Sequence, residues 1–187
     1  MLRPSTGLLA AAGQERRVPL RGRFTKQLAS CCIARLLVLA TEHQQHPIIT
    51  YIDSPGGSAA EALALISTMN GIRCPVFTFC HGQAVGPAAI IAAHGFRGCR
   101  AAVSSARFSF KGFDSAAKTV DGTELDSLFR LLADIFANDT RKPKEQVLKW
   151  FREGIQFNSQ EALTNGLIDV ISVQPVYPKS NDPDRLV

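Results

Sequence analysis

No apolar run in the sequence is long enough to cross a membrane. The longest stretch without a charged residue lies between Arg73 and Arg97, and it is interrupted by Pro75, Gly86 and Pro87 among others. A membrane-spanning helix needs roughly 20 consecutive, predominantly apolar residues. We therefore expect a soluble protein without a membrane partner.

Metal-binding and nucleotide-binding patterns are also missing. The His, Cys, Asp and Glu residues do not cluster at metal-ligand spacing, and no Walker-type glycine loop is present, so we expect no metal and no cofactor. The cysteines are odd in number, lack CxxC spacing and have apolar neighbours, which favours reduced core thiols in the cytoplasm or an organelle stroma. They are Cys31, Cys32, Cys74, Cys80 and Cys99.

The positive charge is confined to one end of the chain. The net charge is +5, yet residues 1–35 hold seven basic residues against Glu15 alone, a net of +6, so the remainder carries −1. Basic clusters attract nucleic acid, but this stretch has one aromatic residue, Phe24, and no recognition motif. We expect a solvated or subunit-facing positive surface and no nucleic-acid partner.

The size and composition indicate one domain. A chain of 187 residues with 45% hydrophobic positions can enclose a single core. We expect that domain at residues 15–175, with a flexible or partner-docked arm at 1–14 and a tail at 176–187. The apolar part of the arm, Leu8 to Ala12, is too short for a secretory signal.

Strand and helix patterns alternate in the first half. We predict a largely buried helix at 26–41, then strands at 48–52 and 75–80, glycine-containing turns at 53–58 and 81–86, and helices at 59–70 and 87–94. Two successive units of strand, glycine turn and helix indicate parallel strands whose ends bring backbone N–H groups together. The fold class is therefore α/β.

The second half contains the clearest amphipathic helix. Apolar residues recur at intervals of three and four along 123–138, which predicts a helix. We also predict strands at 100–103, 107–111 and 167–173, a helix at 143–153 that stops at Gly154, and a short capped helix at 159–166.

Several colinear motifs together resemble one enzyme family. They are Tyr51-Ile-Asp-Ser-Pro-Gly-Gly-Ser58, Cys80-His-Gly-Gln-Ala84, Arg107 before a strand, and Glu161-Ala162 followed by Gly166-Leu-Ile-Asp169. From about residue 15 to 173 the chain resembles the proteolytic subunit of the Clp protease. The resemblance implies a spiral of strand-strand-helix units like that of the crotonase relatives, with a protruding handle helix at 123–138. It also implies seven-membered rings fed by an unfoldase ATPase, and catalysis by Ser, His and Asp.

The matching catalytic positions lack the family's side chains. The nucleophile position, four residues after the glycine of Gly-Gln-Ala, holds Gly86. The base position, four residues after Arg107, holds Lys111, and the acid position, eight residues before Ala162, holds Gly154. The resemblance places the oxyanion hole at the turn glycines, Gly56 and Gly57, and at the residue after the nucleophile. That residue is Pro87, which has no N–H to donate.

Replacement groups lie near these positions. Lys111 could activate a hydroxyl if Ser109, two residues earlier on the same strand face, served as nucleophile. Ser54 and Ser58 are explained more simply by turn and helix-cap roles. His81 lies close to the turn and Glu153 adjoins Gly154, but an acid without a base and nucleophile orients nothing.

We therefore expect a non-catalytic subunit of an ATP-dependent Clp protease, similar to the inactive ClpR-type paralogues. It would form a homomeric ring or a mixed ring with active ClpP-type subunits. The arm does not match the family's N-terminal segment, so coupling to an unfoldase ATPase is expected to be weak or absent. The alternative is an active serine peptidase, or a crotonase-like acyl-handling enzyme with a rearranged site.

Overall fold

The computed structural model describes residues 16–111 and 122–177, without the side chains of 122–126. The arm predicted at 1–14 and residues 178–187 of the predicted tail lie outside this part. In the described part, no helix is long and apolar enough to cross a membrane.

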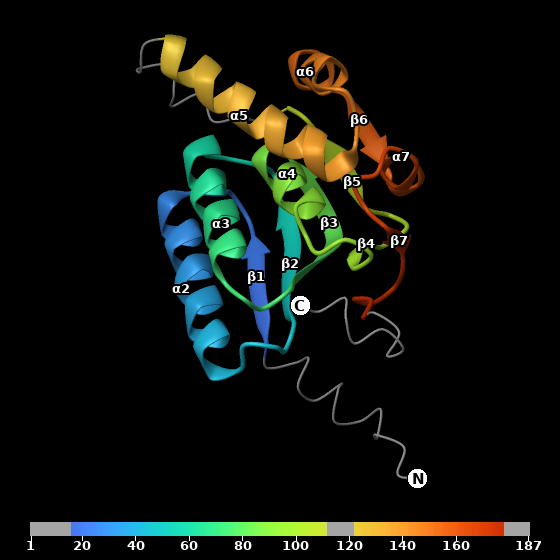
Figure 1. Ribbon diagram of the computed structural model, residues 1–187. Coiled ribbons are helices and arrows are strands. Elements are labelled where there is room, and N and C mark those ends of the chain that lie inside the picture. Colours follow the sequence, from blue (N-terminus) through green and yellow to red (C-terminus); the bar gives the residue numbers. More distant parts are fainter. Residues whose placement is uncertain (1–15, 112–121, 178–187) are drawn as a thin grey trace.

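Parallel strands form the centre of the fold (Figure 1). The main path of the sheet runs β1-β2-β3-β4-β7, and every neighbouring pair on it is parallel. β5 branches off, pairing parallel with the end of β3 and antiparallel with β6. The strands are β1 (Arg17–Arg21), β2 (Ile48–Ser54), β3 (Val76–Val85), β4 (Arg100–Ala102), β5 (Arg107–Ser109), β6 (Gln156–Asn158) and β7 (Val170–Ile171). The parallel arrangement predicted from the strand-turn-helix repeats is confirmed.

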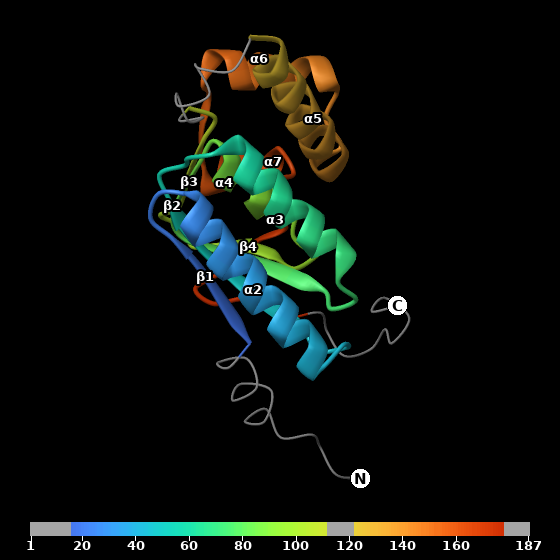
Figure 2. The ribbon, with the colours of Figure 1, turned by 90° about the vertical axis from the view of Figure 1, so that its left-hand side faces the viewer.

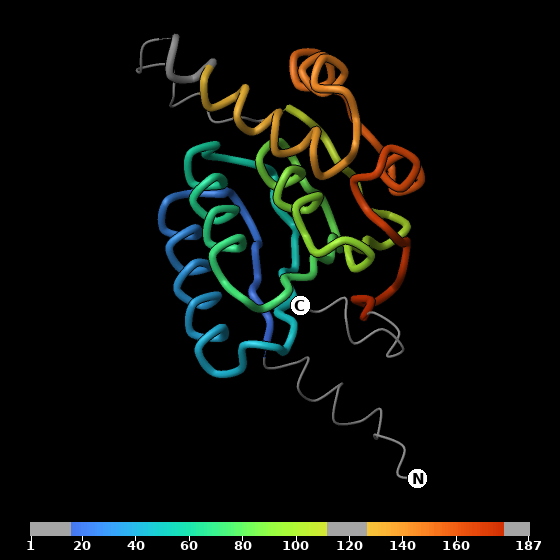
Figure 3. The backbone as a smooth tube through the Cα atoms, viewed as in Figure 1, coloured from blue at the N-terminus to red at the C-terminus, as the bar shows by residue number. Residues whose placement is uncertain are grey.

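Helices cover one face of the sheet and extend beyond one end of it. Figure 2 shows α2 and α3 side by side along the sheet, with α5 and α6 beyond it. The helices are α2 (Lys26–Glu42), α3 (Ala59–Gly71), α4 (Pro87–Ala93), α5 (Gly122–Thr140), α6 (Lys144–Glu153) and α7 (Ser159–Thr164). α5 is the amphipathic helix predicted at 123–138, and the backbone trace shows it passing over α3 and α4, which it contacts (Figure 3).

The two faces of the sheet are built differently. Inward-facing strand residues such as Val18, Leu20 and Ile52 join the helices in one large core. The opposite face carries a small cluster built around Phe77 and Phe79. Because strand side chains alternate between faces, every second residue of β1, β2 and β3 points to this outer face.

Three predictions about the strands need correction. The turn predicted at 81–86 is strand up to Val85, because Gln83 to Val85 pair with β5. β6 was not predicted, since its three residues become strand only through pairing with β5. The closing strand predicted at 167–173 is reduced to Val170–Ile171, which pairs with β4.

The prediction that helix 26–41 is largely buried is wrong, although its bounds are nearly right. Only one face of α2 packs on the core, through residues such as Leu36 and Leu39. Leu37 and Val38 are about half exposed, and Cys31 is exposed and so does not belong to the core. The five cysteines are all free thiols, and burial raises the pKa of Cys80 to about 12.

Candidate functional site

The Ser54–Ser58 turn is fixed by backbone contacts with Phe24. Phe24 N donates to Gly56 O at 2.7 Å, and Ser58 N donates to Phe24 O at 2.8 Å. Gly57 has φ +149°, and a Cβ atom there would overlap the backbone carbonyl of Phe24. A glycine is therefore required at this close approach.

The serines of this turn have the structural roles expected from the sequence. Ser54 is fully buried, and its Oγ accepts a hydrogen bond from Gly56 N at 3.2 Å. Ser58 is the N-cap of α3, where its Oγ accepts from Glu61 N at 3.3 Å. Both hydroxyls thus satisfy N–H groups of the turn and helix.

The chain turns sharply from β3 into α4 at Gly86. Gly86 is buried, with φ 53° and ψ −118°, a combination that side-chain-bearing residues rarely adopt. Its N–H donates to Ser109 O at 2.6 Å, which ties the turn to β5. Pro87 follows as the first residue of α4, so the first amide after Gly86 has no N–H.

Lys111 lies next to this turn, just after β5. Val85 pairs with Ser109 across the β3–β5 boundary, and Ser109 Oγ accepts a hydrogen bond from Lys111 N at 3.3 Å. Phe110, between them, is buried against Trp150 and Phe151 of α6. The packing of Phe110 therefore fixes β5 against α6 and sets the position of Lys111.

Gly154 meets the side chain of Lys111. It caps α6 in the left-handed conformation, with φ 61° and ψ 40°. A Cβ atom at Gly154 would lie 2.5 Å from Lys111 Cγ and 2.9 Å from Lys111 Cε. The aliphatic part of Lys111 thus occupies the space that a side chain at position 154 would need.

The structure therefore brings Gly86, Lys111 and Gly154 to one place, through Ser109 and the Lys111 stem. At that place the three residues contribute one primary amine and no hydroxyl, imidazole or carboxylate. In the Ser54–Ser58 turn, the N–H of Gly56 is already bonded to Ser54 Oγ and that of Ser58 to Phe24 O. Among the described residues, no group of three or more His, Cys, Asp and Glu could hold a metal ion.

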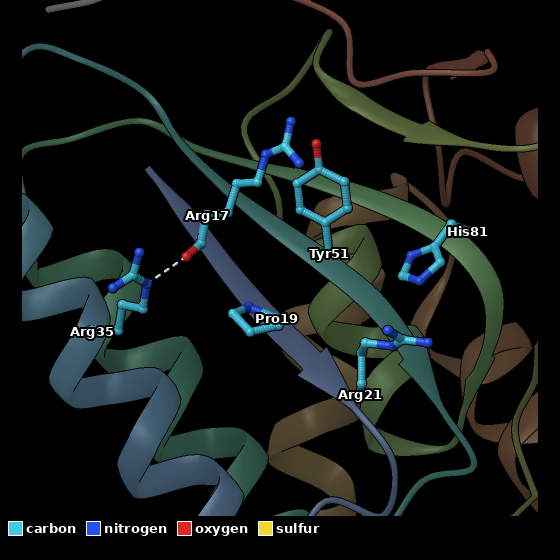
Figure 4. A pocket seen from close by; sticks show the side chains of 6 residues that line it. All are labelled: Arg17, Pro19, Arg21, Arg35, Tyr51 and His81. Atoms are coloured by element: carbon cyan, nitrogen blue, oxygen red, sulfur yellow. Dashed lines mark hydrogen bonds between the residues drawn. The ribbon is translucent and has the colours of Figure 1, made fainter. Parts of the chain in front are cut away.

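Two residues considered as replacements lie elsewhere. His81 is on the outer face of the sheet, where its ring lies edge-on to that of Tyr51 (Figure 4). It also stacks on the ring of Phe79. Glu153 is exposed and faces Lys149 one turn earlier on α6, with 3.9 Å between Oε1 and Nζ. The contacts of these two side chains are therefore with residues other than Lys111.

Sequence reasoning also missed a buried ion pair near β7. Arg100 is 5% exposed and binds both carboxylate oxygens of Asp169, and it also donates to Ala93 O and Asp139 O. Burial alone would raise the pKa of Asp169, but the hydrogen bonds and charge of Arg100 outweigh it and lower this pKa. The pair joins β4, α4, α5 and the segment before β7. The sequence motif Gly166-Leu-Ile-Asp169 contains Asp169, but no sequence pattern indicates its partner Arg100.

Comparisons with known proteins agree with this architecture. The sequence model of the family described as Clp protease matches residues 5–175. The crystal structure of the ClpP protease catalytic domain from Plasmodium falciparum superposes with a TM-score of 0.77 at 26% sequence identity. That alignment covers 97% of this chain and 98% of the Plasmodium chain.

Proposed function

The chain belongs to the Clp protease family, and from this premise we propose that it is a non-catalytic subunit of a ring-shaped Clp protease complex. The observation that carries the proposal is Gly86. It has the conformation of a strained strand-to-helix turn, the kind of turn that presents a nucleophile at a helix N-terminus, but it has no side chain to present. Losing the nucleophile of a Ser-His-Asp site typically removes about six decades of rate.

The remaining features of the site support the same proposal. Lys111 and Gly154 replace the base and acid positions, and Pro87 removes a backbone donor. One oxyanion-hole donor is worth about 3 kcal/mol of transition-state stabilisation. Together with Gly86, these positions leave all three members of the triad and one oxyanion-hole donor without the groups that hydrolysis requires.

A rearranged serine-lysine site is less well supported. Ser109 lies close to Lys111, but its Oγ accepts the backbone N–H of Lys111 at the end of β5, and it does not lie at the N-terminus of α4. An acyl-handling enzyme of the crotonase type would need two converging backbone donors, and Pro87 removes one. Thermal-shift screening of acyl-CoA compounds tests this alternative directly, because a tight ligand raises the melting temperature.

Exposed apolar side chains support assembly into a ring. Leu131 on α5 is 44% exposed, and Leu37 and Val38 on α2 are 49% and 55% exposed. Exposed apolar patches commonly mark protein interfaces. In the proposed role the chain contributes wall and interface surface to a homomeric ring or to a mixed ring with active ClpP-type subunits. The expectation of weak coupling to an unfoldase ATPase loses its basis, because the family model matches from residue 5 and so includes most of the arm.

Hydrolysis of fluorogenic peptides tests the catalytic part of the proposal. The purified chain should show no turnover above the buffer background, while an active ClpP-type subunit prepared in the same way provides the positive control. Turnover that disappears in Ser54→Ala, Ser58→Ala or Ser109→Ala would refute it.

Native mass spectrometry tests the assembly part separately. We expect a ring, alone or on mixing with an active ClpP-type subunit from the same source. A strict monomer in both conditions would contradict the structural role and leave the absence of catalysis standing.

A further inference from the structure

A histidine bridges helices that lie far apart in the sequence. His94 is the C-cap residue of α4, and α4 contacts both α3 and α5 (Figure 1). Nδ1 of His94 lies 2.7 Å from Oδ2 of Asp139 on α5. Its Nε2 lies 3.0 Å from Oδ1 of Asn70 on α3. One imidazole ring therefore joins the ends of three helices through polar contacts.

The contact between His94 and Asp139 is largely shielded from water. The side chains of His94 and Asp139 are 12% and 13% exposed. Within residues 16–111 and 122–177, the Asp139 carboxylate has no other hydrogen bond or ion pair. Electrostatic interactions are stronger in a partly desolvated site than on an open surface. The charge on His94 therefore determines how firmly the Asp139 side chain is held.

The two contacts fit a ring with a proton on each nitrogen. An ionised carboxylate only accepts hydrogen bonds, so Nδ1 of His94 is the donor toward Asp139. The carbonyl oxygen of Asn70 is also an acceptor, so Nε2 donates toward it. A neutral imidazole has one N–H, and it keeps both contacts only if the Asn70 amide turns over to present its NH2 group. The observed pair of contacts is thus the one that an imidazolium makes.

The other charged groups around the ring do not cancel the attraction of Asp139. Arg100 on β4 bonds backbone oxygens of α4 and α5, but Asp169 pairs with its guanidinium through both carboxylate oxygens. Arg97 bonds the backbone of α5 one residue before Asp139, and it is exposed, so solvent and salt screen its charge. The amide that α3 contributes is uncharged. The C-terminal end of α4 itself favours a positive charge on His94.

We propose that protonation of His94 tightens the junction between α4 and the C-terminal end of α5, and that loss of this proton loosens it. The imidazolium forms a charge-assisted hydrogen bond with Asp139, about twice as strong as a neutral one. Histidine is the side chain that ordinarily changes charge between pH 5 and 8. The junction therefore responds to pH in this range. The device is independent of the proposed non-catalytic role, because neither Gly86 nor Lys111 takes part in it.

Hydrogen–deuterium exchange of the full chain, followed by mass spectrometry of peptides, tests the proposal at about pH 5.5 and about pH 8.5. Dividing each exchange rate by that of an unfolded peptide at the same pH removes the intrinsic pH dependence of exchange. Peptides from the C-terminal half of α5 should be about fivefold better protected at the lower pH, the difference between a charge-assisted and a neutral hydrogen bond. Asp169 stays ionised at both pH values because its pKa is lowered, so its pair with Arg100 contributes no difference.

His94→Gln removes the titrating ring but keeps an amide that can donate to Asp139. Its protection should therefore be the same at both pH values. His46→Gln is the matched control, since it removes a histidine from an exposed site after α2, and it should keep the full fivefold change. Protection that does not change with pH in the unmodified chain, or that changes equally in His94→Gln, would overturn the proposal.

Asn70→Asp gives a second test that does not remove the histidine. Asn70 is exposed at the end of α3, and a carboxylate there would face Nε2 of His94. A second nearby negative charge favours the imidazolium, so the midpoint of the protection change should move to higher pH. A merely structural contact would leave the midpoint where it is, and an unmoved midpoint would likewise overturn the proposal.

Discussion

The framework around the site and the site itself differ in how tightly the fold constrains them. The framework consists of the Ser54–Ser58 turn and the Arg100–Asp169 pair, both closed by several hydrogen bonds. The three site positions, Gly86, Lys111 and Gly154, lie together but carry no hydroxyl, imidazole or carboxylate. If the chain is the non-catalytic subunit that we propose, backbone contacts are what maintain the geometry of its site.

The difference has a physical basis in what each residue touches. Changing Gly57 disturbs backbone atoms of Phe24, which cannot move without breaking the turn. Changing Lys111 disturbs an exposed, flexible side chain. Framework substitutions should therefore be costly, and substitution of Lys111 should be tolerated.

Gly57→Ala should give the largest effect. The strained φ costs about 1–3 kcal/mol, and the overlap with Phe24 breaks turn hydrogen bonds worth about 1 kcal/mol each. We expect the free energy of unfolding to fall by about 4 kcal/mol in urea denaturation. Gly71→Ala is the control, because a Cβ there meets nothing within 4 Å. Equal stability of the two variants would remove the distinction between framework and site.

Asp169→Asn should lower the free energy of unfolding by about 3 kcal/mol at neutral pH, because it leaves Arg100 buried without a counter-charge. Asp134→Asn, in an exposed pair with Lys144, should cost less than about 1 kcal/mol. Thermal or urea unfolding of both variants measures the difference.

The effect of Asp169 should depend on pH in a defined direction. The folded-state pKa of Asp169 is lowered, so its stabilisation is complete above the unfolded-state pKa and is lost as the pH falls through the folded value. The stabilities of the unmodified chain and Asp169→Asn should therefore begin to converge as the pH falls below about 4, and converge fully only below the lowered folded-state pKa. A constant difference down to acid pH would contradict the ion-pair account.

Gly154→Ala should have an intermediate effect. The left-handed backbone costs about 1–2 kcal/mol for alanine, and the new methyl group displaces the Lys111 stem. Gly98→Ala is the control that measures the backbone cost alone, since Gly98 has φ +88° and no atom lies within 4 Å of a Cβ added there. In a Lys111→Ala background, the cost of Gly154→Ala should fall to that of Gly98→Ala, and a double-mutant cycle without coupling would contradict the contact.

Lys111→Ala alone should have the smallest effect and change the free energy of unfolding by no more than about 0.5 kcal/mol, as is usual for exposed residues. Urea denaturation measures it beside the variants above. A loss comparable to that of Asp169→Asn would mean that Lys111 belongs to the framework.

Sequence patterns correctly predicted the elements that depend on interactions between residues close together in the chain. The turn at Ser54–Gly57, the proline-initiated α4 and the period of α5 all follow from short-range chemistry and appear where predicted. The extension of β3 to Val85 and the existence of β6 depend on pairing with β5, which no local pattern reveals.

The same distinction between local and long-range information applies to the functional residues. Motif spacing located Gly86, Lys111 and Gly154, but not the packing of Lys111 over Gly154, which requires α6 to lie against β5. The N-terminal excess of positive charge was visible in the sequence. The contact of Arg35 with β1 was not, because it forms only once α2 is packed against the sheet.

Intact-mass measurement after treatment with a fluorophosphonate probe tests the central claim most directly, because the probe bonds covalently only to an activated serine. The account predicts that the purified chain keeps its unmodified mass, while an active ClpP-type subunit in the same tube gains one adduct per subunit. A stoichiometric adduct on any serine of this chain would show a working nucleophile and contradict the account.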